Sequence, residues 1–251
     1  SMGKDSIGWG AMVGIASALM AERGFTGIEP LFSDIGESAD SDTALGTAAP
    51  IPSLGQRYEV LNLYFKPFAS CRWAQPAVAG ALQIARQHGL KPRDIVCIRV
   101  DTFAAAQELS RARPQNTEEA QYNLAFPMAA ALVDGEVGPR QVLPPRLFAE
   151  EILSLADLVE VRVKDEYEAL FPKKRYADVE VETRDGRVYR AARQEAIWEP
   201  PNTLPADGEL EAKFRWLVSP VLGDERTATL GALVWGFDQV NDVRQLLQLL
   251  Q

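Results

Sequence analysis

The sequence has few of the residues that bind metals or form disulfides. Its 251 residues include two cysteines, Cys71 and Cys97, and a single histidine, His88. Two cysteines cannot build a disulfide framework, and these two lack the spacing of a zinc site. We therefore expect no metal site, and we expect a reducing compartment, the cytoplasm, where unpaired thiols are the rule.

The sequence also lacks an excess of positive charge. Lys and Arg together number 26 against 35 Asp and Glu, which gives a net charge of −9. A nucleic-acid partner requires a basic face that neutralises phosphates, so we expect none. A local basic site is still able to bind a small anion inside an acidic protein, because nearby charges dominate the field.

An uncharged N-terminal stretch is too short to cross a bilayer, which takes about 20 apolar residues. The stretch runs from Ser6 to Ala21 and contains three glycines, which suit close helix packing. A signal peptide is the alternative interpretation. We favour a buried core helix over residues 7–22, ended by Gly24, and we expect no membrane partner.

The remaining patterns alternate between strands and helices. Strands are expected at 58–65, 94–103, 158–163, 176–183 and 187–191, with a hairpin turn at Asp185-Gly186. Helices are expected at 76–88, 117–133, 146–155, 207–218, 225–235 and 238–250. This order predicts an α+β fold in which an α/β middle domain is inserted between helices of a helical domain.

That fold divides the chain into four segments. Residues 1–35 are expected to belong to the helical domain. Residues 36–56, rich in Ser, Asp, Gly and Pro, are typical of a linker loop. Residues 57–200 are the expected α/β domain, and residues 201–251 are C-terminal helices that return to the helical domain.

A lysine, a cysteine and an arginine lie close together just before the expected helix at 76–88. They are Lys66, Cys71 and Arg72. A helix N-terminus carries free N–H groups and a partial positive charge, and anions bind there. Arg72 is able to hold a carboxylate with two hydrogen bonds, and the positive field favours the Cys71 thiolate. The pattern indicates a carboxylate or phosphate site, with solvated charges and a buried cysteine as the alternative.

Four segments, in order along the chain, resemble motifs of the MmgE/PrpD family. They are ALMAERGFTG at 18–27, KPFASCRWAQP at 66–76, PQNTEEAQYNLAFPMAAALVDG at 114–135 and ELEAKF at 209–214. The family includes 2-methylcitrate dehydratases, cis-aconitate decarboxylases and iminodisuccinate epimerases. The resemblance implies a helical domain plus a smaller α/β domain, and chemistry without a cofactor. It also implies that this chain is a C-terminal portion, without the upstream helical region of the family.

The resemblance, together with the basic motif, selects the candidate site residues. Lys66 matches the active-site lysine of the family, and Lys4 lies near the position of a second one, so both are catalytic candidates. The candidates for substrate binding are Arg72, Cys71, Gln75, Tyr122 and Asn123.

Two positions depart from the family pattern. The family histidine before the proline is Gln75 here, and the family tyrosine of the next helix corresponds to Phe126. Gln75 is able to donate a hydrogen bond but not to titrate near neutral pH, and Phe126 does neither. His88 is expected to be exposed at the end of its helix. The run Lys173-Lys174-Arg175 is expected to be a solvated turn.

Two functions of different classes follow. The first is a cofactor-independent lyase or isomerase of the dehydratase, decarboxylase or epimerase type, acting on a small di- or tricarboxylate. In it, Lys66 and Arg72 stabilise carboxylate charge, and the missing region supplies the proton-transfer groups. The second is a non-catalytic subunit or carboxylate-binding module, which Gln75 and Phe126 favour. In both, helices at the two ends of the chain should expose apolar faces, which predicts a homodimer or a hetero-oligomer with a helical N-terminal half.

Overall fold

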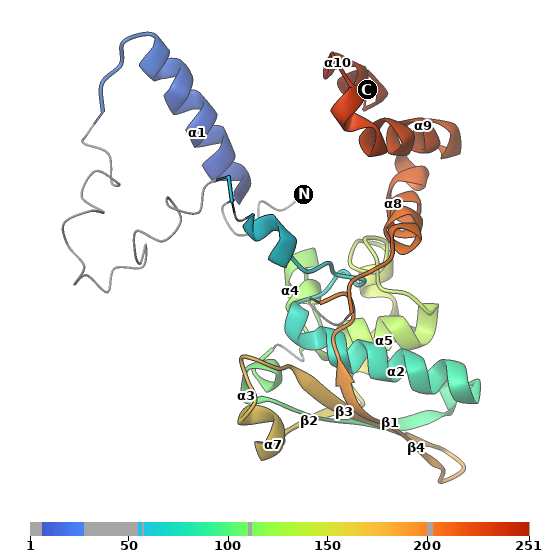
Figure 1. Ribbon diagram of the computed structural model, residues 1–251. Coiled ribbons are helices and arrows are strands. Elements are labelled where there is room, and N and C mark those ends of the chain that lie inside the picture. The colour runs from blue at the N-terminus through green and yellow to red at the C-terminus, as the bar shows by residue number, and fades with distance from the viewer. Residues whose placement is uncertain (1–6, 28–54, 57, 110–111, 200–202, 251) are drawn as a thin grey trace, which may run out of the picture. The chain divides into compact units, whose positions relative to one another are not determined.

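The computed structural model describes residues 7–27, 55–56, 58–109, 112–199 and 203–250 (Figure 1). The chain divides into two units, Ser1–Leu61 and Asn62–Gln251. The candidate residue Lys4 and most of the expected linker lie outside the described residues. The finer division of the chain into four segments stays a prediction.

In the first unit, helix α1 covers Ile7–Glu22, with the bounds that the sequence predicts. Gly24, at a φ of +82°, ends it. The N–H of Phe25 donates to the carbonyl of Met20 at 3.0 Å, which closes the helix end as in a Schellman motif. The expected burial is wrong: residues 8–27 are all exposed. The described part of this unit holds no second layer on which α1 could bury an apolar surface.

The strand expected at 58–65 is also wrong. Residues Glu59–Asn62 form a 3-10 helix instead. Beyond it, the N–H of Phe65 donates to the carbonyl of Trp198 at 3.1 Å. A strand requires a ladder of such bonds, and this segment does not belong to the sheet.

The second unit contains one sheet of four strands. They are β1 (Ile95–Thr102), β2 (Val159–Val163), β3 (Tyr176–Thr183) and β4 (Val188–Glu195). The spatial order is β2-β1-β3-β4, with β1 and β2 parallel and the other pairs antiparallel. All four strands lie where the sequence places them, and β4 runs four residues further than expected because it pairs with β3 as far as Tyr176.

Helix α2 (Gln75–His88) packs on β3 and β4 (Figure 1). Alternate residues of β3 are buried beneath it, as a strand with one covered face requires. The approach is close: a Cβ atom added at Gly80 would lie 2.7 Å from Cγ2 of Val179. Gly89, at a φ of +60°, ends α2 as predicted.

The helix expected at 117–133 is in fact two helices, α4 (Thr117–Gln121) and α5 (Ala125–Asp134). The predicted cap is present, since the Asn116 side chain accepts from the N–H of Glu119 at 2.9 Å. The break has a cause in Pro127. A continuous helix would place this proline in its interior, whereas the restart places it in the first turn of α5, where no N–H is needed.

The remaining helices surround these elements. They are α3 (Ala104–Gln107), α6 (Glu150–Ala156), α7 (Asp165–Glu168), α8 (Asp207–Leu222), α9 (Asp224–Trp235) and α10 (Arg244–Leu249). Short 3-10 turns stand at Arg72–Ala74, Pro92–Asp94, Arg146–Phe148 and Phe237–Gln239, so the helices expected at 146–155 and 238–250 are each shorter than predicted.

The mixed α/β architecture is therefore confirmed, while insertion into a helical domain stays a prediction. Among the helices that the structure describes, none has the length and apolar character that crossing a membrane requires.

Candidate functional site

The loop from Lys66 to Gln75 is fastened to the core. The N–H of Ala69 donates to the carbonyl of Val137 at 2.9 Å, and the N–H of Cys71 donates to that of Gln121 at 2.7 Å. The loop then enters the 3-10 turn Arg72–Ala74 before α2 begins. The first residues of α2, from Gln75 to Val78, are buried, and the predicted anion site at this N-terminus stays a prediction.

The side chain of Gln75 holds the loop before α2 in place. The residue is only 2% exposed. Its amide nitrogen donates to the carbonyl of Phe68 and to the carbonyl and hydroxyl of Ser70, at distances of 2.9–3.1 Å. Its amide oxygen is buried and has no partner among the described residues. Gln75 thus holds the loop from within.

Arg72 is paired with a carboxylate of the protein itself. Its Nε and Nη2 atoms donate to the two oxygens of Glu199 at 2.5 and 2.6 Å. Its guanidinium also lies 3.9 Å from the centroid of the Tyr64 ring. The hydrogen bonds to Glu199 raise the pKa of Arg72. The Nε and Nη2 atoms of Arg72, which could otherwise hold a ligand carboxylate with two hydrogen bonds, are therefore already occupied by Glu199.

Two lysines lie together near Trp198, the residue before Glu199. Lys213, on α8, donates from Nζ to the backbone carbonyl of Lys66, and Nζ lies 5.9 Å from the centroid of the Trp198 ring. Burial, and then the charge of Lys66, lower the pKa of Lys213. The Lys66 side chain itself is exposed. Within the described residues, neither lysine forms an ion pair with a carboxylate.

Arg175, from the turn before β3, lies near Arg72 and Glu199, and the prediction of a solvated turn is wrong for it. Its side chain is half-buried, and its Nε atom is buried without a hydrogen-bond partner in the described structure. Burial, and then the nearby charge of Arg72, lower the pKa of Arg175, while Glu199 opposes them. The neighbouring Lys174 differs, because it donates to Glu195 at 2.9 Å.

The segment Trp198-Glu199 connects these cations. Trp198 has a φ of +66°, a strained conformation for a residue with a side chain. Its carbonyl accepts from Phe65, and the N–H of Glu199 donates to Oγ1 of Thr203 at 2.9 Å. We call Lys66, Arg72, Arg175 and Lys213 the basic cluster. Glu199 is the carboxylate that pairs with it, so the cluster keeps a net positive charge.

Sequence reasoning found two members of the basic cluster and missed two. Lys213 lies in the ELEAKF segment, which was already marked by its resemblance to the family, and Arg175 lies in the noted charge run. Their convergence has no local signal, since Arg72 and its partner Glu199 are 127 residues apart.

The other candidates lie in the core or its rim. Cys71 is partly buried and packs against the hydrophobic core, which agrees with the apolar alternative. Asn123 is 1% exposed. Its amide nitrogen donates to the carbonyl of Ala112 at 2.9 Å, and its amide oxygen accepts from the N–H of Phe126 at 2.8 Å. Tyr122 is 39% exposed at the end of α4. The roles of these three residues in substrate binding stay predictions.

His88 lies apart from these groups. It is exposed at the end of α2, as predicted, with its ring centroid 4.4 Å from that of Tyr189. In the part of the chain that the structure describes, no group of three or more His, Cys, Asp or Glu residues is arranged to hold a metal ion.

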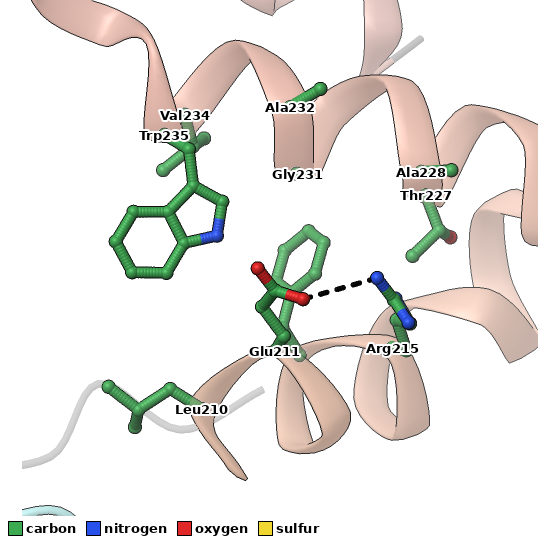
Figure 2. A pocket seen from close by; sticks show the side chains of 10 residues that line it. Leu210, Glu211, Arg215, Thr227, Ala228, Gly231, Ala232, Val234 and Trp235 are labelled. Carbon is green, nitrogen blue, oxygen red and sulfur yellow. Dashed lines mark hydrogen bonds and ion pairs between the residues drawn. The ribbon is translucent and has the colours of Figure 1, made fainter. Parts of the chain in front are cut away.

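A cavity of about 320 Å³ lies between α8 and α9 (Figure 2). None of the residues that line it belongs to the basic cluster. Apolar and small side chains line most of it, among them Leu210, Phe214, Gly231 and Trp235. Its charged lining residues, Glu211 and Arg215, form an ion pair with each other at 3.2 Å. It therefore lacks an unpaired cation for an anionic ligand.

A comparison with known families agrees with this architecture. The model of the MmgE/PrpD C-terminal domain matches residues 68–238, which is more than half of the chain. The matched range includes Arg72, Arg175, Glu199 and Lys213, and it begins two residues after Lys66. The comparison with curated proteins found no match to the chain.

Proposed function

The chain belongs to the MmgE/PrpD family, and from that premise we propose that it takes part in a dehydratase-like lyase or related isomerase reaction. The proposed substrate is a small di- or tricarboxylate, and the proposed chemistry uses no cofactor. The observation that carries the proposal is the basic cluster: Glu199 pairs with Arg72 and acts on Arg175, while Lys66 and Lys213 lie together without a carboxylate partner among the described residues.

The charge of the basic cluster suits this class of reaction. Loss of a proton next to a carboxylate generates an enolate-like anion, and fixed cations lower the energy of that state. Lys66 is exposed and unpaired among the described residues, so its ammonium group is available to a carboxylate of the substrate. Arg72 contributes by fixing Glu199, and with it the Trp198-Glu199 segment.

The reaction also needs a group that moves a proton. Gln75 and Phe126 are buried and are unable to titrate, so they do not replace the family histidine and tyrosine. Lys213 is a better candidate, because burial and then the charge of Lys66 lower its pKa from the ordinary value, the direction that suits a group that moves a proton. Lys4 stays a proposed second lysine of the site, outside the described residues.

The experiment is a binding titration with citrate as the probe. The Lys66→Ala variant should weaken citrate binding by about tenfold to a hundredfold, because it removes a charge-assisted hydrogen bond. The Lys91→Ala variant is the matched control, since it removes an exposed lysine of the same unit. Equal affinities of Lys66→Ala and the unmodified protein would remove Lys66 from the site. Turnover is then measured on 2-methylcitrate and cis-aconitate.

A second function is favoured by one observation. Both positions that carry titratable groups in the family, Gln75 and Phe126, hold buried residues that do not titrate here. A non-catalytic, carboxylate-binding subunit fits that observation. Citrate binding that is sensitive to Lys66→Ala, without turnover by the chain or by its native complex, would support this function over the enzyme.

A further inference from the structure

We propose that Arg175 is the guanidinium that receives a carboxylate group of the ligand, the role that the sequence pattern assigns to Arg72. This inference rests on the proposed function, because it takes the ligand to be a small polycarboxylate. The inference adds Arg175 to the residues that determine ligand binding. It also divides the basic cluster into two places that contact the ligand, Arg175 at one and Lys66 with Lys213 at the other.

The first step is the occupancy of Arg72. Both oxygens of Glu199 accept from its fork at 2.5 and 2.6 Å, and one face of its guanidinium lies on Tyr64. A ligand carboxylate would have to displace Glu199, whose side chain is only 12% exposed. Displacement would leave that carboxylate buried and unpaired, which is costly.

The second step is the state of Arg175. Its Nε–H is buried without an acceptor, and no carboxylate pairs with its guanidinium in the described part of the chain. A buried donor without a partner is rare in folded proteins and calls for an explanation. A planar guanidinium matches a carboxylate with two parallel hydrogen bonds, and a ligand carboxylate would accept them from Nη1 and Nη2, because the buried Nε is closed to a ligand that arrives from solvent.

The third step concerns the charges around Arg175. The charges of Arg72, Glu199 and Tyr64 act on it, and those of Arg72 and Glu199 offset each other. Its guanidinium carbon also lies 5.9 Å from the centroid of the Phe171 ring, which carries no charge. Lys174, its neighbour in sequence, is neutralised by Glu195. The charge of Arg175 is therefore left unbalanced. Lys66 and Lys213 provide a second unbalanced point beside Trp198, the residue adjacent to Glu199. Two such points favour a ligand with at least two carboxylates.

The test uses citrate as the probe, calorimetry for affinity, and thermal unfolding of the ligand-free protein for stability. The Arg175→Gln variant should bind citrate about tenfold to a hundredfold more weakly. Arg175→Lys should recover part of the loss, because it keeps the charge and loses the fork. Lys173→Gln is the matched control: it removes one positive charge from an exposed side chain of the same turn, and it should leave the affinity unchanged.

Stability separates a ligand contact from a structural role. In the ligand-free protein, Arg175→Gln should leave the unfolding temperature unchanged or raise it, since it removes a desolvated and unpaired charge. Arg72→Gln should lower it, because Glu199 loses its partner. A decrease for Arg175→Gln as large as that for Arg72→Gln would assign Arg175 a structural role and overturn the proposal.

Three further outcomes separate this inference from the proposed function. Unchanged citrate affinity in Arg175→Gln, with a loss in Lys66→Ala, would overturn the inference and leave the proposed function standing. A loss in Arg175→Gln, with no change in Lys66→Ala, would support the inference and remove Lys66 from the proposed site. No citrate binding by the unmodified chain in its native complex would overturn both.

Discussion

Two helices of this protein are nearly alike in composition and opposite in environment. Helix α1 and helix α5 are both uncharged until their last residue, which is Glu22 in α1 and Asp134 in α5. In α1, Trp9 is 59% exposed and Ile15 is 66% exposed. In α5, every residue from Ala125 to Leu132 is buried.

The difference comes from the neighbours of each helix. Helix α5 packs against α2 and α6, so its apolar surface is covered on more than one side. The unit that contains α1 provides no such layers among its described residues. An apolar helix sequence thus predicts that the helix is buried, but it does not predict which part of the protein covers it. The predictions below test this contrast.

The largest effect is expected from truncation of an aromatic side chain in the two environments. Phe126→Ala in α5 should lower the free energy of unfolding by about 3–5 kcal/mol, because it removes a fully buried ring and leaves a cavity. Trp9→Ala in α1 should change it by less than about 0.5 kcal/mol, as expected for exposed positions. Urea unfolding followed by circular dichroism measures both.

Similar losses of unfolding free energy in Phe126→Ala and Trp9→Ala would contradict the difference in environment between α5 and α1. A loss of several kcal/mol in Trp9→Ala would mean that α1 is buried in the protein in solution. The original prediction of a core helix would then be correct for the assembled molecule. A small loss in Phe126→Ala would mean that the core around α5 collapses onto the vacated space.

Much of the fold was readable from the sequence because its signals are local. The bounds of α1 and β3 follow directly from the apolar pattern, and Gly24 and Gly89 mark helix ends because they adopt positive φ angles. The errors arise where a second principle competes. The apolar pattern of residues 117–133 predicts one helix, but the missing N–H of Pro127 decides in favour of two.

The site was less readable because its members are brought together by the fold. The motif around Lys66 and Arg72 identified two of the four members of the basic cluster. Its partner Glu199 and the cations Arg175 and Lys213 come from distant segments with no shared pattern. Asn123 shows a second kind of distant contact, since this polar side chain joins Ala112 to the start of α5, and its role in substrate binding stays a prediction.

A smaller effect is expected at the end of α5, where a buried helix is fixed by charge. Asp134 accepts from Nε of Arg146 at 2.9 Å and from Gln141 at 2.9 Å. Asp134→Asn should cost about 1.5–3 kcal/mol at pH 7, the range for hydrogen bonds to charged groups. The hydrogen bond from Arg146 lowers the pKa of Asp134 in the folded state.

The pH dependence of this loss follows from the lowered pKa. The pair stabilises the fold above the unfolded value of about 3.9 and loses its contribution as the pH falls through the folded value. The difference between Asp134→Asn and the unmodified protein should therefore be full at pH 7 and shrink below about pH 4, in urea unfolding at each pH. The exposed control Asp165→Asn should show little loss at any pH. A difference that persists in acid would show that the amide disturbs the site sterically.

A double substitution on α1 should have the smallest effect on the free energy of unfolding, but it should change the association of the protein with partners. Ile15 and Leu19 are 66% and 57% exposed and lie one turn apart on the same side of the helix. The double variant Ile15→Glu, Leu19→Lys should leave the unfolding free energy within about 0.5 kcal/mol. It should also reduce the binding of a hydrophobic dye and shift the native mass towards the monomer, because exposed apolar patches mark contacts with partners.

The control for this variant is Ser17→Glu, Ala21→Lys, which introduces the same charges at the same spacing without removing a large apolar side chain. If both double variants dissociate the protein equally, charge on α1 is responsible and the apolar surface is not. If the unmodified protein is a monomer that binds no dye, α1 needs no partner. If only Ile15→Glu, Leu19→Lys dissociates it, the difference between α1 and α5 reduces to the source of the covering surface. In that case helix α5 obtains its covering surface from its own unit, and α1 obtains it from another chain.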